Sequence, residues 1–202
     1  GYAVGGSGSQ SIELILKTTD GGQSWTQQTN GNYKQLSGVH FPAVDTGYAV
    51  GNTGTILKTV DGGNVWSPQT SGTTSLLRSV QFIDTDTGYT VGASGKILKT
   101  INGGQTWTSQ ISGTINTLFS VYFIDAQNGI IVGDNGTILQ TTNGGGNWIP
   151  QTSGTGNLLL YVHFIGNTGF AVGESGTIFK TVLSVDIPEL SQTSFSLYPN
   201  PT

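Results

Sequence analysis

Two acidic side chains, Asp134 and Glu174, are the pair whose positions could support acid–base chemistry. They occupy equivalent places in two neighbouring units of a sequence repeat. Hydrolysis of a glycosidic bond uses two carboxyl groups roughly 5–10 Å apart. Acidic residues are equally typical of solvated turns, where a carboxylate accepts bonds from the nearby backbone. The sequence therefore favours a chain without catalytic residues, with a polysaccharide-acting glycoside hydrolase as the alternative.

Metal chemistry has few candidate ligands. His40 and His163 hold the same place in a recurring Val-x-Phe segment, but in units that are not neighbours. A zinc site needs three or four convergent donors, so we expect packed, hydrogen-bonded histidines. Asp84 and Asp86 could hold Ca²⁺ loosely, although turn-closing bonds suit them better. We expect no metal and no cofactor.

Charge excludes further classes of function. The chain has 202 residues, a net charge of −4, 9% charged residues and no cysteine, and its one arginine is Arg78. Nucleic-acid binding needs clustered Lys and Arg, so no nucleic-acid partner is expected. No apolar run reaches the roughly 18–20 residues of a membrane span. The missing cysteines exclude a disulfide framework.

A repeat organises the whole chain. Four tryptophans, Trp25, Trp66, Trp107 and Trp148, follow one another at intervals of 41 residues. Such a fixed period indicates a repeat architecture. An apolar run precedes each turn, and Asp-Gly or Asn-Gly between β-formers is a strong hairpin signal. Each unit therefore predicts a tight β-hairpin closed by a packed Trp.

The turn motif reads Thr-x-Asp/Asn-Gly-Gly-x-x-Trp in all four copies. Its residues are Thr18, Asp20, Gly22 and Trp25; Thr59, Asp61, Gly63 and Trp66; Thr100, Asn102, Gly104 and Trp107; and Thr141, Asn143, Gly145 and Trp148. Asn in place of Asp keeps the turn geometry but is a poor acid–base group. The motif is therefore expected to be structural.

This motif resembles the Asp-box of BNR-type β-propellers, found in sialidases, sortilin-type receptors and photosystem II assembly factors. The fuller unit, residues 47–59, is most similar to the assembly-factor-like repeats. The resemblance implies a propeller in which the Asp-box lies away from any active site. A sialidase would need an arginine triad that Arg78 alone cannot supply. The single arginine also weighs against a role in photosystem assembly, because the assembly-factor family carries an arginine-rich patch.

The units predict an all-β propeller of four-stranded antiparallel blades, with a β-solenoid as the less favoured alternative. About five blades are visible over residues 1–182, and the chain is expected to be a fragment of a larger propeller. The first blade begins at its second strand and carries a five-residue insertion before Lys17. The last blade is expected to stop after its third strand and lacks the turn motif. Open blade edges would permit self-association, although the tail could fill one of them.

The tail differs from the repeats. Residues 183–194 form a polar linker that contains Pro188, and residues 195–202 read Phe-Ser-Leu-Tyr-Pro-Asn-Pro-Thr. This ending resembles the start of the C-terminal sorting domain of the Bacteroidota type IX secretion system. The resemblance implies a secreted or outer-membrane surface protein whose tail engages that machinery.

Recognition is expected on the face opposite the turn motifs, the usual binding face of a propeller. Loops there vary between units and are rich in Asn, Thr, Ser and Tyr, which suit hydrogen-bonded recognition. The candidate residues are Tyr33, Asn52, Ser94, Asp134, Asn135 and Glu174. The chain is thus expected to be a recognition or adhesion module for an extracellular glycan or protein. A structural or self-assembling surface subunit remains an alternative.

Overall fold

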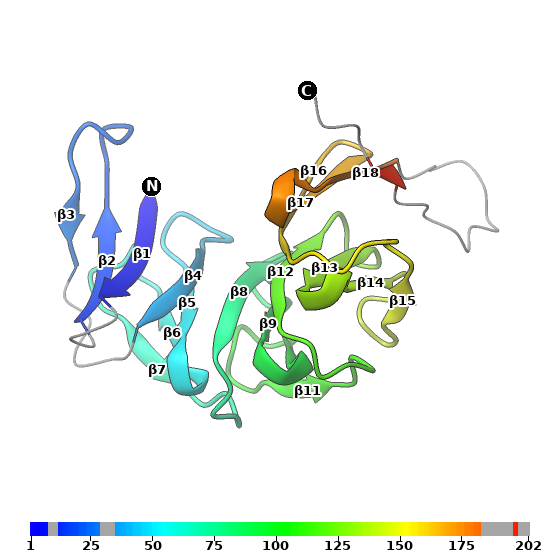
Figure 1. The fold of residues 1–202 in the computed structure, drawn as a ribbon. Helices are drawn as coiled ribbons and strands as arrows, with labels where there is room; N and C mark the ends of the chain where they lie inside the picture. Colours follow the sequence, from blue (N-terminus) through cyan, green and yellow to red (C-terminus); the bar gives the residue numbers. More distant parts are fainter. Residues whose placement is uncertain (8–11, 29–34, 183–195, 198–202) are drawn as a thin grey trace.

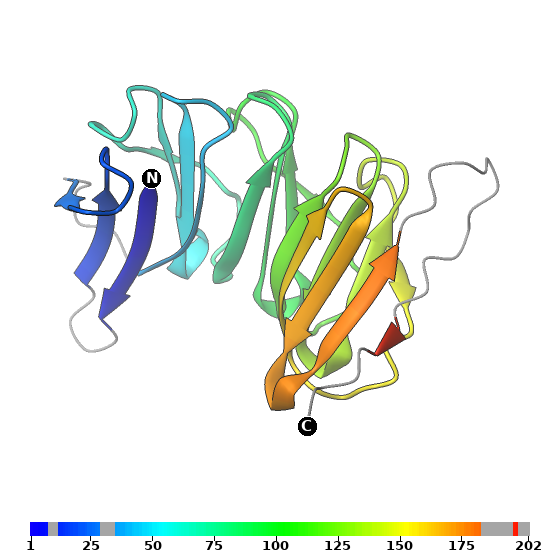
Figure 2. The ribbon, with the colours of Figure 1, turned by 90° about the horizontal axis from the view of Figure 1, so that it is seen from above.

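The computed structural model describes residues 1–7, 12–28, 35–182 and 196–197. These residues form five antiparallel sheets, four of them with four strands and the first with three. The sheets follow one another along an open arc, with the first and last sheets at its two ends (Figures 1 and 2). The predicted β-propeller of about five blades is confirmed.

The strands follow the chain in blade order. Blade 1 holds β1 (Tyr2–Ser7), β2 (Ile12–Lys17) and β3 (Thr26–Gln27); blade 2 holds β4 (Leu36–His40), β5 (Gly47–Gly51), β6 (Ile56–Thr59) and β7 (Ser67–Gln69); blade 3 holds β8 (Leu77–Phe82), β9 (Gly88–Gly92), β10 (Ile97–Thr100) and β11 (Thr108–Gln110); blade 4 holds β12 (Leu118–Phe123), β13 (Gly129–Gly133), β14 (Ile138–Thr141) and β15 (Ile149–Gln151); blade 5 holds β16 (Leu159–Ile165), β17 (Thr168–Gly173), β18 (Ile178–Val182) and β19 (Ser196–Leu197).

The two end blades depart from the regular pattern. The first strand of blades 2 to 5 is the inner strand, and the described residues of blade 1 include no such strand, as the sequence predicts. The insertion in blade 1 lengthens the β1–β2 hairpin, where Gly6 pairs with Glu13. The sequence predicts three strands for blade 5, and the structure adds a short fourth strand. In that strand Leu197 pairs with Phe179 and Ser196 with Lys180. These two residues therefore cover part of the outer edge of blade 5, and not the open edge of blade 1 that the tail was considered to fill. Residues 183–195 and 198–202 lie outside the described residues.

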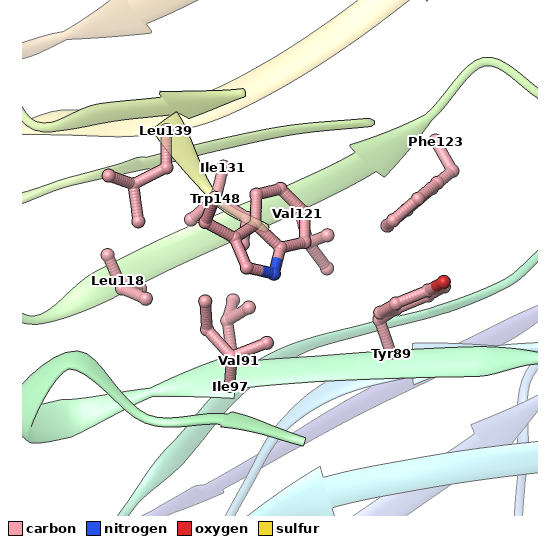
Figure 3. Packing of buried hydrophobic residues seen from close by; sticks show 9 residues of the cluster. All are labelled: Tyr89, Val91, Ile97, Leu118, Val121, Phe123, Ile131, Leu139 and Trp148. Carbon is pink, nitrogen blue, oxygen red and sulfur yellow. The ribbon is translucent and has the colours of Figure 1, made fainter. Parts of the chain in front are cut away.

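The hydrophobic core lies between the blades. Tyr89, Val91 and Ile97 of blade 3 form one buried cluster with six residues of blade 4, among them Val121 and Phe123 (Figure 3). Each other pair of neighbouring blades shares a buried cluster of the same kind, with residues from both blades. Each inner strand supplies its half of this core through the pattern Leu-x-x-Val-x-Phe, as in Leu77 to Phe82. The blade boundary, and not the single sheet, is therefore the unit of packing.

In blades 2 to 5, a glycine ends the second strand, at positions 51, 92, 133 and 173. A Cβ added at these positions would lie 2.2, 2.0, 2.4 and 1.9 Å, respectively, from a backbone carbonyl oxygen at the start of the inner strand. Real Cβ atoms do not approach backbone this closely, so only glycine fits. The glycine is required by the inner strand beside it.

Candidate binding site in the central cavity

The Asp-box turns are closed by hydrogen bonds within the motif. In blade 4, Thr141 Oγ1 donates to Asn143 Oδ1 over 3.0 Å and accepts from the Gly145 N–H over 2.8 Å. Asn143 Oδ1 also accepts from the Asn147 N–H. The boxes that contain Asp20, Asp61 and Asn102 make the same bonds. Only an acceptor oxygen is needed at this position, which explains why Asn replaces Asp freely.

The two Asp-box carboxylates are held in the ionised form. Bonds from the Ser24 hydroxyl and backbone lower the pKa of Asp20 well below its usual value. The Val65 N–H and the Thr59 hydroxyl lower the pKa of Asp61. A general acid needs a raised pKa near the working pH, so these groups are unsuited to that role.

A second set of bonds joins the Asp-boxes of blades 2, 3 and 4 to the preceding blade. Tyr89 OH and Lys99 Nζ of blade 3 both donate to the carbonyl oxygen of Gly144 in blade 4, each over 2.7 Å. Blade 2 holds Gly103 and blade 1 holds Gly62 through corresponding Tyr and Lys donors. We call this Tyr–Lys pair and its carbonyl the latch.

Blade 4 indicates that the Tyr and Lys donors occur only where the next blade carries an Asp-box. Ile130 and Gln140, a cross-strand pair, stand where blade 3 has Tyr89 and Lys99. The sequence of blade 5, which follows blade 4, carries no Asp-box. The sequence shows that the Tyr–Lys pair and the next Asp-box are missing together, but only the structure shows that these donors and the Asp-box carbonyl meet across a blade boundary.

Alkaline pH should weaken the latch. Burial, with a smaller contribution from a nearby Asp, raises the pKa of Tyr48 and of Tyr89 from 10.0 to about 12. The folded chain therefore holds these protons more tightly than the unfolded chain does, and this stabilisation is lost as the pH rises from about 10 to about 12. We expect the thermal unfolding midpoint to fall over this range. The decline should be smaller in a Tyr48→Phe/Tyr89→Phe variant, and equal declines would contradict the assignment.

The inner strands of blades 2 to 5 line a central cavity of about 570 Å³, on the concave side of the open arc. The side chains at the variable positions of Leu-x-x-Val-x-Phe line it. They include the chain's one arginine, Arg78, whose guanidinium lies 5.4 Å from the centroid of the Phe119 ring. Tyr161 is 57% exposed, and its ring stacks on His163, which meets Tyr122 edge-on at 5.0 Å. A cation and several aromatic rings thus converge in one hollow.

Three of the lining side chains also join the inner strands. His40 Nδ1 accepts a bond from the Phe82 N–H over 3.3 Å, and Gln81 bonds both backbone groups of Phe123. Tyr122 OH donates to the Phe164 carbonyl oxygen. The predicted packed, hydrogen-bonded role is confirmed for His40. It is wrong for His163, which is exposed and meets its neighbours Tyr122 and Tyr161 through ring contacts.

No cluster of three or more His, Cys, Asp or Glu suited to a metal occurs among the described residues. Asp84 Oδ1 accepts bonds from the N–H groups of Asp86 and Thr87, so its carboxylate closes the turn, as expected. 

Acid should weaken the boundary between blades 2 and 3. Burial lowers the pKa of His40 below 6.5, so the unfolded chain takes up this proton first and stability is lost as the pH falls below 6.5. Protonation at Nδ1 would also remove the acceptor of the Phe82 bond, a loss of about 1 kcal/mol. We expect the midpoint of unfolding to depend less on pH between about 6.5 and 4.5 in His40→Gln, because Gln81 serves this position in the next blade. An unchanged dependence would contradict this role.

The predicted loop residues lie on the face opposite the Asp-boxes, in four short 3-10 turns: η1 (Asn52–Gly54), η2 (Ala93–Gly95), η3 (Asp134–Gly136) and η4 (Glu174–Gly176). Neighbouring loops are bonded to them, for example Gly136 N to the Asn157 carbonyl oxygen and Asn135 Nδ2 to Asn116 Oδ1. Asp134 Oδ1 accepts from the Asn135 N–H within its own turn. Neither Asp134 nor Glu174 lines the central cavity, and Tyr33 lies outside the described residues.

Sequence reasoning did not identify the cavity. Its signal was present: the Leu, Val and Phe of each inner strand are constant, while the positions between them change, as in Arg78, Phe119 and Leu160. Those variable positions face the centre, and only the arc of blades shows that they converge.

Four-stranded blades around a central cavity, joined through Asp-box turns, define a BNR-type β-propeller module. The chain belongs to the BNR repeat family described as photosynthesis system II assembly factor YCF48, whose family model matches residues 28–109, 64–148 and 109–184. No curated protein matches the chain. Among the described residues, no helix has the length and apolar character needed to cross a membrane.

Solved structures share the fold. YCF48 from Cyanidioschyzon merolae is 23% identical with a TM-score of 0.71, and the match covers 97% of this chain and 66% of that one. YCF48 bound to a D1 peptide is 21% identical with a TM-score of 0.64, over 83% and 54%. A GH74 enzyme from Niastella koreensis is 20% identical with a TM-score of 0.69, over 96% and 37%. This chain therefore spans between half and two thirds of the YCF48 structures.

Proposed function

We propose that the chain is a non-catalytic recognition module that binds a protein partner through its central cavity. The observation that carries this proposal is the convergence of Arg78, Phe119, Tyr161 and His163 in one hollow. Arg and Tyr are the residue types that dominate binding energy at protein interfaces. The related YCF48 was solved with a bound D1 peptide, which supports a polypeptide ligand over a glycan.

A polysaccharide hydrolase is the second candidate, because the fold is shared with GH74 enzymes. It would need Asp134 and Glu174 as its acid–base pair. Both lie in turns outside the cavity lining, and the Asp134 carboxylate is bonded to its own turn. Turnover of plant or algal polysaccharides that is lost in Asp134→Asn/Glu174→Gln would establish the hydrolase and overturn the non-catalytic proposal.

We also propose that the protein is secreted or displayed on the outer-membrane surface, with residues 195–202 engaging the type IX machinery. The support is the Leu-Tyr-Pro-Asn-Pro string that follows the blades. In a host with that system, the full-length protein should reach the surface or medium and a Tyr198→Ala/Asn200→Ala variant should be retained. Equal export of both would contradict this proposal.

The binding proposal is tested with peptide and glycan arrays probed with the labelled chain. The Arg78→Ala/Tyr161→Ala variant removes two exposed cavity side chains, and Val44→Ala, an 88% exposed side chain outside the cavity lining, is the matched control. We expect peptide ligands that bind the wild type and Val44→Ala equally and bind the cavity variant at least tenfold more weakly. Ligands restricted to glycans, or binding that ignores the cavity variant, would overturn the proposal.

A further inference from the structure

A second hollow lies beside the outer strands of blade 4. It is lined by η3, β14 and β15, and by residues 112–114 and 152–155 of the loops that join β11 to β12 and β15 to β16. Its volume is about 520 Å³, within the roughly 300–1,000 Å³ typical of small-molecule sites. We call this hollow the outer groove. It shares no lining residue with the central cavity, so the two hollows are separate candidate sites.

The outer groove offers apolar surface and hydroxyl groups without charge. Its apolar side chains include Leu139, Trp148 and Pro150, and its hydroxyl groups include those of Thr114, Thr137 and Thr152. Among the described residues, no Asp, Glu, Lys or Arg lines it. A ligand that carries a carboxylate, a phosphate or an ammonium group would therefore lose water there without gaining a charged partner. The lining suits a neutral ligand.

Two of these hydroxyl groups can still bond a ligand. Thr152 is exposed, and its side chain makes no hydrogen bond to a described residue. Thr114 Oγ1 accepts a bond from the Asn116 N–H over 3.1 Å and donates to no described group. The indole N–H of Trp148 is already bonded to Gln110 Oε1, so this side chain offers apolar ring surface alone. Since a hydroxyl both donates and accepts, the two threonines match a ligand that is itself rich in hydroxyl groups.

Blade 3 shows what closes the corresponding space. Lys96 and Ser109 stand where blade 4 has Thr137 and Pro150. Lys96 Nζ donates to Ser109 Oγ over 3.4 Å, so the long side chain lies across β10 and β11. Thr137 is shorter, and its hydroxyl is turned back to the Asp134 carbonyl oxygen over 2.6 Å. The surface of β14 and β15 is left open for this reason.

An extended polypeptide suits the outer groove less well than a sugar. β15 is the edge strand of blade 4 among the described residues, and a peptide would gain most by pairing with it. Pro150, the middle residue of β15, has no N–H to donate to an added strand. A sugar ring needs no such pairing, because its faces carry C–H groups and its rim carries hydroxyl groups.

We propose that the outer groove binds a neutral saccharide unit of a glycan chain. The C–H face of the sugar ring packs on Pro150 and on the exposed edge of Trp148, and its hydroxyl groups bond to Thr114 and Thr152. This site is additional to peptide recognition in the central cavity and does not depend on it.

The test is nuclear magnetic resonance of the intact labelled chain, read at the Trp148 indole and at Thr152. The probes are three neutral glucans, cellopentaose, laminaripentaose and maltopentaose, with pentagalacturonic acid as the charged comparison. Thr137→Lys/Pro150→Ser copies the residues of blade 3 and should fill the groove in a fold that tolerates them. Thr152→Ala, a change at an exposed position, removes one hydroxyl without filling the groove.

Blade 2 supplies the matched control. Its residues Thr55, Leu57, Trp66, Pro68 and Thr70 are identical to those at the equivalent positions of blade 4. The loop that would face them includes residues 29–34, which lie outside the described residues. Thr55→Lys/Pro68→Ser therefore makes the same chemical change at a distance from the outer groove.

We expect at least one neutral glucan to shift the Trp148 and Thr152 signals saturably, and pentagalacturonic acid to leave them unchanged. Binding at these signals should weaken at least tenfold in Thr137→Lys/Pro150→Ser and at least threefold in Thr152→Ala. It should be unaltered in Thr55→Lys/Pro68→Ser.

Four outcomes would overturn the proposal: no response to any neutral glucan, equal binding by both groove variants, a response to pentagalacturonic acid alone, or an array peptide that occupies the groove in place of a sugar. The Arg78→Ala/Tyr161→Ala variant separates this site from the central cavity. It should bind the glucan normally, and loss of glucan binding in that variant would place the sugar in the central cavity and contradict the outer groove. Failure of the sugar site would leave peptide binding by the central cavity unchanged.

Discussion

Replacing Trp148 by alanine should lower the free energy of unfolding by about 3–5 kcal/mol, the usual cost of deleting a buried aromatic side chain. Trp148 is 7% exposed, belongs to the core between blades 3 and 4, and donates its indole N–H to Gln110 Oε1. Its removal therefore leaves both a cavity and an unsatisfied acceptor. Chemical denaturation followed by circular dichroism measures the loss.

Trp25 provides the matched control for this prediction. It holds the same place in the Asp-box of blade 1 but is 44% exposed. Trp25→Ala should cost less than about 1.5 kcal/mol, because partial exposure removes most of the transfer and cavity terms. Equal losses in the two variants would mean that the Trp stabilises its own hairpin, and not the boundary between blades.

The second large effect is expected at Gly92. A Cβ there would lie 2.0 Å from the Leu76 carbonyl oxygen, so Gly92→Ala must displace the inner strand β8 from β9. Overpacking of this kind costs about 3 kcal/mol. Gly5→Ala makes the same change where nothing lies within 4 Å, and it should alter stability by less than about 0.5 kcal/mol.

The free energies of unfolding of Gly92→Ala and Gly5→Ala, measured under identical conditions, test whether the inner strand is the reason for glycine at position 92. A stable Gly92→Ala would show that β8 can move away at little cost, and the explanation for glycine at this position would fail. A strongly destabilised Gly5→Ala would show that β1 already has a partner strand.

Local patterns were sufficient to predict most of the fold. The turn around Asn143 and Gly145 is specified by residues within eight positions of one another, and its 41-residue recurrence gives the blade. Turn chemistry of this kind acts through short-range bonds, such as Thr141 Oγ1 to Asn143 Oδ1, and so can be read from the sequence. The placement of the 3-10 turns opposite the Asp-boxes follows from strand alternation.

Contacts between blades could not be predicted in the same way. Tyr89 and Lys99 meet the Gly144 carbonyl oxygen 55 and 45 residues away, and no local signal links them. The cavity has the same origin, because Arg78 and Tyr161 come from different blades and converge only through the curvature of the arc. The pairing of Ser196–Leu197 with β18 likewise depends on an open edge and not on a strand signal in the tail.

Family membership explains the blades and their turns, but not the side chains that line the cavity. The BNR repeat match and the YCF48 structures share the blades and the Asp-boxes. The side chains that would contact a ligand lie at the variable inner-strand positions, such as Phe119 and Tyr161. Their cation and aromatic rings suit a polypeptide ligand, and partner choice is therefore expected to differ between members with similar blades.

The most direct measurement of cavity recognition is nuclear magnetic resonance of the labelled chain, titrated with a peptide selected on the array. Chemical-shift changes should centre on Arg78, Phe119, Tyr161 and His163 and should saturate together. Changes confined to the Asp-box face, around Val44 and Ile101, or to Asp134 and Glu174 with breakdown of a polysaccharide, would contradict recognition through the central cavity.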